Sequence, residues 1–236
     1  MTEYKQSNEI KKYLKTKKRK KRIKKVIMIV IVLTITLILL ISLLVNLYQS
    51  LTGITYKKEL GNEIYKSIEE VRTRNESILL TLDGCITSQS ITKEEILTLY
   101  KNYNLINIAE LNLWEKYLKS IEVSLFKKDN KVDLTESSQN EVFANIEELI
   151  YNLLLNYMSD NMDSIKLDDK LSMDISVMKE ISNELNNYIN SFMEEKLSNL
   201  ESEEKAEKMI SKGYWIDILK GIEEINSKYK NYMFKL

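Results

Sequence analysis

The chain has 236 residues, of which five are glycine, one is cysteine and none is proline or histidine. Without histidine and with a single thiol, one chain cannot build a tetrahedral zinc site, a carboxylate–histidine di-iron site, or a Ser–His or Cys–His catalytic pair. The formal charge of zero is a cancellation, because residues 1–25 carry +10, residues 26–56 carry no charge and residues 57–236 carry −10. The sequence therefore divides into a basic tail, an uncharged segment and an acidic domain.

The scarcity of turn-forming residues predicts the fold class. Average usage of about 7% glycine and about 5% proline would give roughly sixteen and twelve residues at this length. A chain with five glycines and no proline has few tight turns, which favours long helices over a many-stranded sandwich or barrel. We therefore expect an all-α protein, with a single N-terminal transmembrane helix followed by an antiparallel bundle of about five helices.

Residues 26–48 are predicted to form a transmembrane signal-anchor helix. The segment from Val26 to Val45 is apolar except for Thr34, Thr36 and Ser42, whose hydroxyl groups can bond to backbone carbonyl groups one turn earlier. A helix of this length spans about 30 Å, the thickness of the hydrocarbon core of a bilayer. The main alternative is a cleaved signal peptide, which would have a shorter apolar core of about 7–15 residues followed by a small-residue cleavage site. The longer core favours an uncleaved anchor.

The basic residues beside this segment predict its orientation. Positive residues close to the end of a transmembrane helix stay in the cytoplasm, so we expect residues 1–25 to be a cytoplasmic tail and residues 57–236 to be extracytoplasmic. The basic block is expected to contact anionic lipid headgroups through Lys17, Lys18, Arg19, Lys20, Lys21, Arg22, Lys24 and Lys25. Nucleic-acid binding is the alternative interpretation, and we disfavour it because such basic flanks are the normal topological signal.

Residues 49–56 are predicted to be a juxtamembrane linker, with Gly53 and Gly61 as points of flexibility. The bundle is expected to begin at residue 57, and its first helix carries one apolar stripe: Leu60, Ile64, Ile68, Val71, Ile78 and Leu82. Asn75 interrupts this stripe, and we interpret it as a buried polar residue that fixes helix pairing rather than as a ligand contact. Gly84 suits a left-handed cap, so the helix is predicted to end at Asp83-Gly84.

The second helix is predicted to begin at a capping box, with Thr92 as N-cap and Glu95 reaching back to it. A break is predicted at Asn102–Asn104. The expected apolar positions of this helix are Leu97, Tyr100, Leu111, Trp114, Leu118, Ile121 and Leu125. Three more helices follow, and their stripes are Val142, Ile146, Leu149 and Leu153, then Met178, Ile181, Leu185, Tyr188 and Phe192, then Trp215, Ile218, Ile222, Ile225, Tyr229 and Tyr232.

No catalytic residue, metal ligand or cofactor site is predicted. The aspartates in residues 129–133 and 160–163 resemble calcium loops, but both segments lack the third ligand and the glycine that such loops need. Glutamates 201, 203, 204 and 207 are interpreted as the charged first turn of a helix. Cys85 follows Gly84 in the predicted turn, so we expect it near the surface, either as a free thiol or in a disulfide between two protomers.

The sequence predicts a single-pass, membrane-anchored, non-catalytic helical bundle that acts as an interaction or scaffold module at the bacterial cell envelope. Its expected partners are the membrane and either another protein or a second copy of itself. A sensory or small-ligand-binding bundle that signals through a membrane partner is the alternative. A pore-forming protein is a third class, which one uninterrupted span with a large polar domain disfavours.

Overall fold

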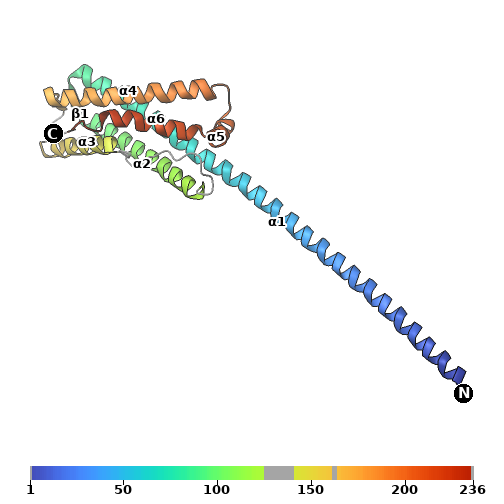
Figure 1. Ribbon diagram of the computed structural model, residues 1–236. Coiled ribbons are helices and arrows are strands. Elements are labelled where there is room, and N and C mark those ends of the chain that lie inside the picture. Colours follow the sequence, from blue (N-terminus) through green and yellow to red (C-terminus); the bar gives the residue numbers. More distant parts are fainter. Residues whose placement is uncertain (1, 125–140, 161–163, 235–236) are drawn as a thin grey trace. The chain divides into compact units, whose positions relative to one another are not determined.

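The computed structural model describes residues 2–124, 141–160 and 164–234 (Figure 1). Most of these residues are helical, which confirms the all-α fold class. The elements in chain order are α1 (Thr2–Ser88), β1 (Ser90–Thr92), α2 (Lys93–Ser124), α3 (Glu141–Asp160), β2 (Ser164–Lys166), α4 (Asp169–Leu197), α5 (Ser202–Ser211) and α6 (Tyr214–Tyr229). The chain divides into two compact units, Met1–Tyr56 and Lys57–Leu236.

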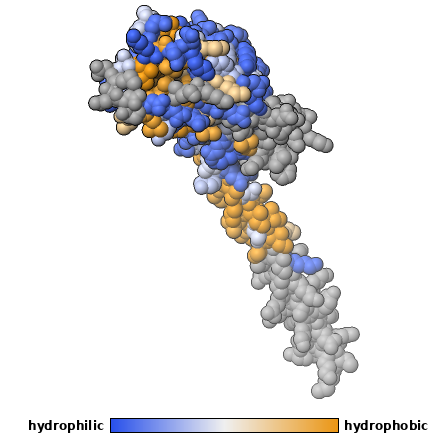
Figure 2. All heavy atoms as spheres, turned by 90° about the vertical axis from the view of Figure 1, so that its left-hand side faces the viewer, coloured by the Kyte–Doolittle hydropathy of each residue, from blue (hydrophilic) through white to orange (hydrophobic). Residues whose placement is uncertain are grey.

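In the first unit, α1 carries the apolar segment predicted to span a membrane. Among the described residues, one helix is long and apolar enough for such a span, and its apolar part lies near the N-terminus. All side chains from residue 28 to residue 56 are exposed, and Figure 2 shows the band of hydrophobic residues that they form. The Thr34 hydroxyl donates to the Val30 carbonyl at 2.7 Å, and the Thr36 hydroxyl donates to the Val32 carbonyl at 2.9 Å. The expected bonding of these two hydroxyl groups is confirmed.

The second unit is a helical bundle around one apolar core. The predicted stripe on α1 is buried from Ile64 to Leu82, with each residue exposed by 1% or less. The predicted stripes of α3, α4 and α6 also supply buried residues, including Ile146, Ile181 and Ile218. Neighbouring helices run in opposite directions. Tyr100 and Asn104 on α2 contact Tyr151 and Glu147 on α3, and Glu184 and Tyr188 on α4 contact Lys228 and Asp217 on α6.

The first bundle helix does not end at Gly84. It continues to Ser88, and the chain reverses at Gln89, which adopts a left-handed φ of 52°. The reversal places Ile91 opposite Ile165, where β1 and β2 pair in antiparallel directions. The turn predicted at Asp83-Gly84 is therefore wrong. The end of α1 is set by the pairing of β1 with β2, which lies far along the sequence. The capping box that follows is confirmed, since the Thr92 N–H donates to the Glu95 carboxylate at 2.8 Å and the Glu95 N–H donates to the Thr92 hydroxyl at 3.3 Å.

Helix α2 differs from its prediction in two ways. It is continuous from Lys93 to Ser124, so the predicted break at Asn102–Asn104 is wrong. Asn102 is buried and donates from Nδ2 to the Ser77 hydroxyl on α1 at 2.9 Å, which removes the cost of burying its amide. The core-facing side is also different, and its buried residues are Ile96, Leu99, Tyr103, Ile106, Leu113 and Tyr117. Of the predicted core residues, Trp114 is buried, whereas Leu97, Leu111 and Leu118 are exposed.

Two further differences from the prediction concern Gly61 and the number of helices. Gly61 lies buried within α1, where its Cα faces the Ala206 carbonyl of α5, so the expectation of flexibility at Gly61 is wrong. The fourth predicted helix ends at Leu197, and the separate helix α5 then begins with Glu201 as N-cap and Glu204 completing a capping box. The acidic turn predicted around Glu201 is thus the start of a helix. The described residues contain six helices.

Candidate functional site

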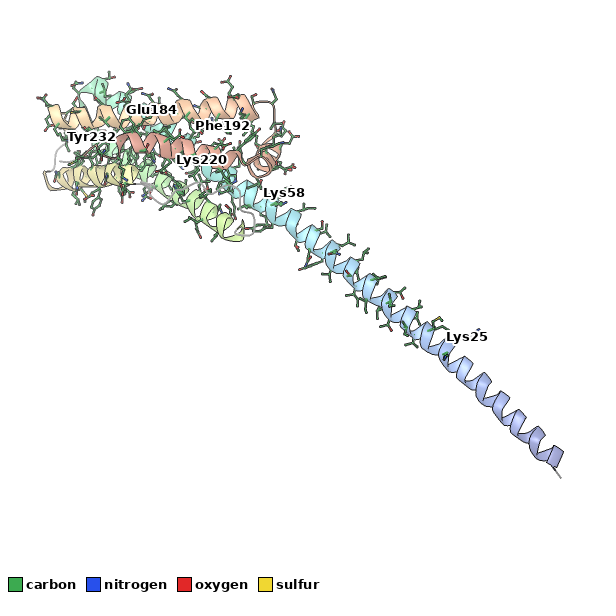
Figure 3. All side chains as sticks on the ribbon, in the orientation of Figure 1. Lys25, Lys58, Glu184, Phe192, Lys220 and Tyr232 are labelled. Carbon is green, nitrogen blue, oxygen red and sulfur yellow. The ribbon has the colours of Figure 1, made fainter. Side chains whose placement is uncertain are left out.

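The basic block and the apolar segment lie on the first unit. The side chains of Lys17, Lys18, Arg19, Lys20, Lys21 and Arg22 are outside the described side chains. Lys24 and Lys25 are described and exposed, and Lys25 is labelled in Figure 3. The two calcium-like segments at 129–133 and 160–163 fall on residues that are largely outside the described ranges. In the described part of the chain, no group of three or more His, Cys, Asp or Glu side chains is placed to hold a metal ion.

Cys85 lies in the core of the bundle, and the expectation that it is near the surface is wrong. Because α1 continues past Gly84, Cys85 stays on the helical face of Ile78 and Leu82 and is fully buried as a free thiol. Burial, together with the nearby Glu95 carboxylate, raises the pKa of the thiol to about 12. The thiolate is the reactive form of cysteine, so this environment suppresses thiol chemistry. A disulfide to a second protomer would require Sγ to leave the core.

Asn75 lies in the core, as its position in the apolar stripe predicted. Its Nδ2 donates to the Ser182 carbonyl on α4 at 2.7 Å, and the residue is 1% exposed. The Ser182 hydroxyl also lies 3.5 Å from the Tyr103 hydroxyl on α2. These contacts join three helices through polar groups that have few other partners. Such a buried polar contact fixes the relative register of the helices.

A second buried polar cluster was not predicted, and it centres on Glu110 of α2. Glu110 is fully buried, and its Oε1 accepts a hydrogen bond from Asn226 Nδ2 of α6 at 3.3 Å. Its other carboxyl oxygen, Oε2, has no hydrogen-bond partner in the structure. Burial, together with the charge of Glu223 on α6, raises the pKa of Glu110 to about 8. The nearby Trp114 indole lowers the pKa slightly, although its N–H makes no hydrogen bond of ordinary geometry.

The position of Glu110 on α2 explains why its carboxyl group is buried. It lies seven residues after Tyr103 and seven before Tyr117, on the buried side of α2. The predicted stripe of Leu97, Leu111 and Leu118 lies on a different side of α2, so the prediction placed Glu110 outside the core. A carboxyl group with a pKa near 8 is mostly protonated at neutral pH, so Glu110 is a neutral hydrogen-bonding group there. Glu110 is therefore a buried residue that can bind or release a proton near neutral pH.

Asp174 of α4 holds the C-terminal segment against the bundle. Its side chain is buried, and its Oδ1 accepts hydrogen bonds from Lys170 Nζ at 2.6 Å and from the Tyr232 hydroxyl at 2.7 Å. Lys170 also lies 5.6 Å from the centre of the Tyr232 ring, and the Tyr232 ring contacts Phe234. Burial, followed by the hydrogen bond to Asp174, raises the pKa of Tyr232 to about 12. Tyr232 (Figure 3) thus anchors residues 230–234 to the start of α4.

Two grooves open on the surface of the bundle. One has a volume of about 350 Å³ between α1 and α2 and is lined by Lys66, Ser67, Ile108 and Asn112, among others. The other has a volume of about 670 Å³ and lies between α3 and the C-terminal segment. Its polar lining includes Asn145, Asn152, Asn156 and Tyr232. The first groove also contains the charged side chains of Glu63, Glu70 and Lys116, beside the apolar Leu105 and Ala109.

An exposed apolar face covers the outer side of α2 and α3. Its large apolar side chains are exposed by 43% to 68%, and we call this set the α2–α3 face: Leu97, Ile108, Leu111, Leu118, Tyr151, Leu155 and Met158. The Tyr100 and Tyr151 rings, 6.0 Å apart, connect the two helices at this surface. Asn104 and Asn107 of α2 donate to the Glu147 carboxylate of α3 beside it. Exposed apolar side chains that gather on two neighbouring helices typically mark an interaction site.

No protein-family model matches the chain, and no curated protein or solved structure matches it.

Proposed function

We propose that the protein is a single-pass membrane protein whose residues 57–236 form a non-catalytic interaction or scaffold module at the cell envelope. The observation that carries the proposal is the α2–α3 face, a row of exposed apolar side chains on two neighbouring helices of an otherwise packed bundle. Burying apolar surface releases about 25 cal/mol for each Å² removed from water. A protein partner that covers this face would therefore gain affinity from side chains that the fold itself leaves in water.

The proposed membrane anchor determines on which side of the membrane the bundle lies. Residues 26–48 are uncharged, and the side chains from residue 28 onward are exposed in the structure, as expected for a helix that meets lipid. The adjacent basic residues keep the N-terminus in the cytoplasm and contact anionic lipid headgroups. This orientation puts the acidic bundle outside the cell membrane. We propose no nucleic-acid partner and no cofactor.

Site-specific photo-crosslinking tests the interaction function. A benzophenone amino acid at Leu111 or at Tyr151 is expected to capture a protein in intact cells, because both side chains lie on the α2–α3 face. The same amino acid at Glu194, an exposed position on α4 outside this face, is the matched control and should capture much less. Equal capture from all three positions, or none from any, would contradict an interaction through this face.

A second candidate function is ligand sensing, and the groove of about 670 Å³ beside α3 favours it. Three asparagine amides from one helix, together with Tyr232, could recognise a polar small molecule. A thermal-shift screen of the full chain in detergent distinguishes the two functions, because a bound ligand stabilises the folded state. Stabilisation that Asn152→Leu abolishes would favour sensing over the interaction function.

A further inference from the structure

One side of α3 presents a row of polar side chains to the groove of about 670 Å³. The row consists of Asn145, Glu148, Asn152 and Asn156, whose spacings of three and four residues place them along one side of the helix. All four residues are exposed. The row extends about 16 Å along the helix axis, at 1.5 Å for each residue. The groove therefore offers hydrogen-bonding groups to an elongated ligand.

The opposite wall of the groove is aromatic. Tyr232 and Phe234 line it, and the centroids of their rings lie 4.7 Å apart at an interplanar angle of 64°. Tyr232 (Figure 3) is held in place, because its hydroxyl donates to Asp174 at 2.7 Å and Lys170 Nζ lies 5.6 Å from the centre of its ring. A wall that is fixed before binding loses little conformational entropy when a ligand arrives.

These two walls match the two kinds of surface on a sugar ring. The side-chain amide of asparagine has two N–H donors and one carbonyl acceptor, so one asparagine can donate to one hydroxyl group and accept from its neighbour. The C–H faces of a sugar ring are apolar and pack on the faces of aromatic rings. A groove with amides on one wall and aromatic rings on the other offers both contacts to the same ligand.

The charge of the groove favours a neutral ligand. Among the described residues that line it, Glu148 is the one acid and Lys230 is the one base. A nucleic acid needs an excess of basic groups, whereas residues 57–236 carry −10. Peptide recognition usually relies on a sheet edge, an apolar groove or a set of aromatic-lined pockets. The continuous polar row on α3 therefore favours a saccharide over a peptide.

We propose that the groove between α3 and residues 230–234 binds a neutral oligosaccharide. The asparagine amides of α3 bond to its hydroxyl groups, and Tyr232 and Phe234 pack on the faces of its rings. The proposal rests on the second candidate function, ligand sensing, and names the class of ligand. It does not require a partner on the α2–α3 face. The proposed position of the bundle outside the membrane gives this groove access to the polysaccharides of the cell wall.

Isothermal titration calorimetry of the full chain in lipid nanodiscs tests the proposal without a detergent that carries a sugar headgroup. The probes are chitotetraose, cellotetraose and maltotetraose, and at least one of them is expected to bind. Asn152→Leu and Phe234→Ala should each weaken that binding about tenfold, because one removes an amide and the other an aromatic ring. Asn187→Leu is the matched control, since it changes an exposed asparagine of α4 outside the groove, and it should bind like the unchanged chain.

Two results would overturn the saccharide site. One is the absence of binding by all three tetrasaccharides at concentrations up to about 10 mM, where even weak binding is detectable. The other is a tetrasaccharide that binds Asn152→Leu or Phe234→Ala as tightly as it binds the unchanged chain. Tighter binding of tetraalanine than of every tetrasaccharide would assign the groove to peptides and overturn the proposal as well.

The thermal-shift screen separates failure of this proposal from failure of the sensing function. A compound other than a saccharide that stabilises the unchanged chain but not Asn152→Leu overturns the saccharide and leaves sensing in place. Absence of stabilisation by every compound, together with absence of tetrasaccharide binding, overturns both. Photo-crosslinking from Leu111 and Tyr151 tests the interaction function in either case.

Discussion

Replacing Glu110 with glutamine is expected to stabilise the bundle above neutral pH and to flatten its pH dependence. Burial raises the pKa of Glu110 from 4.5 to about 8, so the folded state holds a proton that the unfolded state releases between these values. The stabilisation from this proton is complete below pH 4.5 and is lost as the pH rises toward 8, by up to about 1.4 kcal/mol for each pH unit. Glutamine is neutral throughout and keeps an oxygen that can accept from Asn226 Nδ2.

Urea unfolding of the full chain in detergent at several pH values measures this effect. Trp114 and Trp215 are both buried in the bundle, so their fluorescence reports its unfolding. Glu115→Gln is the matched control, since it removes an exposed carboxylate from the next turn of the same helix. The control should leave the slope of stability against pH nearly unchanged. Identical slopes for the parent chain and Glu110→Gln would show that Glu110 is not a titrating group in the core.

Gly61→Ala is expected to destabilise the bundle by about 2 kcal/mol, because it forces α1 and α5 apart. A Cβ atom at Gly61 would lie 2.6 Å from the Ala206 carbonyl oxygen, a backbone atom that can move only with α5. Alanine normally favours a helix over glycine, so the predicted loss of stability runs against the intrinsic helix propensity. The same unfolding measurement, at one pH, gives the change in the free energy of unfolding.

Gly53→Ala provides the control for this substitution. Gly53 lies in the same helix, and a Cβ atom there would have nothing within 4 Å. Its effect on unfolding of the bundle should stay within about 0.5 kcal/mol. If Gly61→Ala behaves like Gly53→Ala, the close contact between α1 and α5 does not exist in solution.

The parts of the fold that the sequence predicted are those governed by local pattern. The stripes that contain Ile68, Ile146, Ile181 and Ile218 have one apolar side each, so their burial follows from helical periodicity alone. The capping box at Thr92 is equally local, because both of its hydrogen bonds join residues three apart. The apolar segment that begins at residue 26 was also predictable without tertiary contacts, because its uncharged, apolar composition alone distinguishes it from the rest of the chain.

Helix α2 shows where local pattern is insufficient. It has apolar residues on two sides, and Leu97, Leu111 and Leu118 gave a regular stripe that the fold leaves exposed. The side that is buried contains Asn102 and Glu110, two polar residues that only their partners Ser77 and Asn226 make tolerable in the core. Those partners lie on other helices, so the pattern within α2 does not reveal them. The same misassigned side is the one that carries the proposed interaction surface.

The positions of Cys85 and Gly61 also depended on distant partners. Pairing of β1 with β2 delays the end of α1 and keeps Cys85 in the core, while packing of α5 against α1 occupies the space beside Gly61. Asn75 was the exception, because a lone amide in an otherwise regular stripe indicates a buried polar contact from sequence alone. Asn75 was therefore placed correctly although its partner Ser182 is distant in sequence, whereas Cys85 and Gly61 were not.

Thiol labelling tests the proposed topology, in which one membrane span holds the bundle outside the cell. Leu80→Cys introduces an exposed thiol on the bundle, and Gln6→Cys introduces one in the basic tail. The unchanged chain measures the background from buried Cys85. With the cell wall removed, a membrane-impermeant maleimide is predicted to label Leu80→Cys in intact cells and Gln6→Cys only after the membrane is permeabilised. Labelling of Gln6→Cys in intact cells, with Leu80→Cys protected until permeabilisation, would contradict the proposed topology.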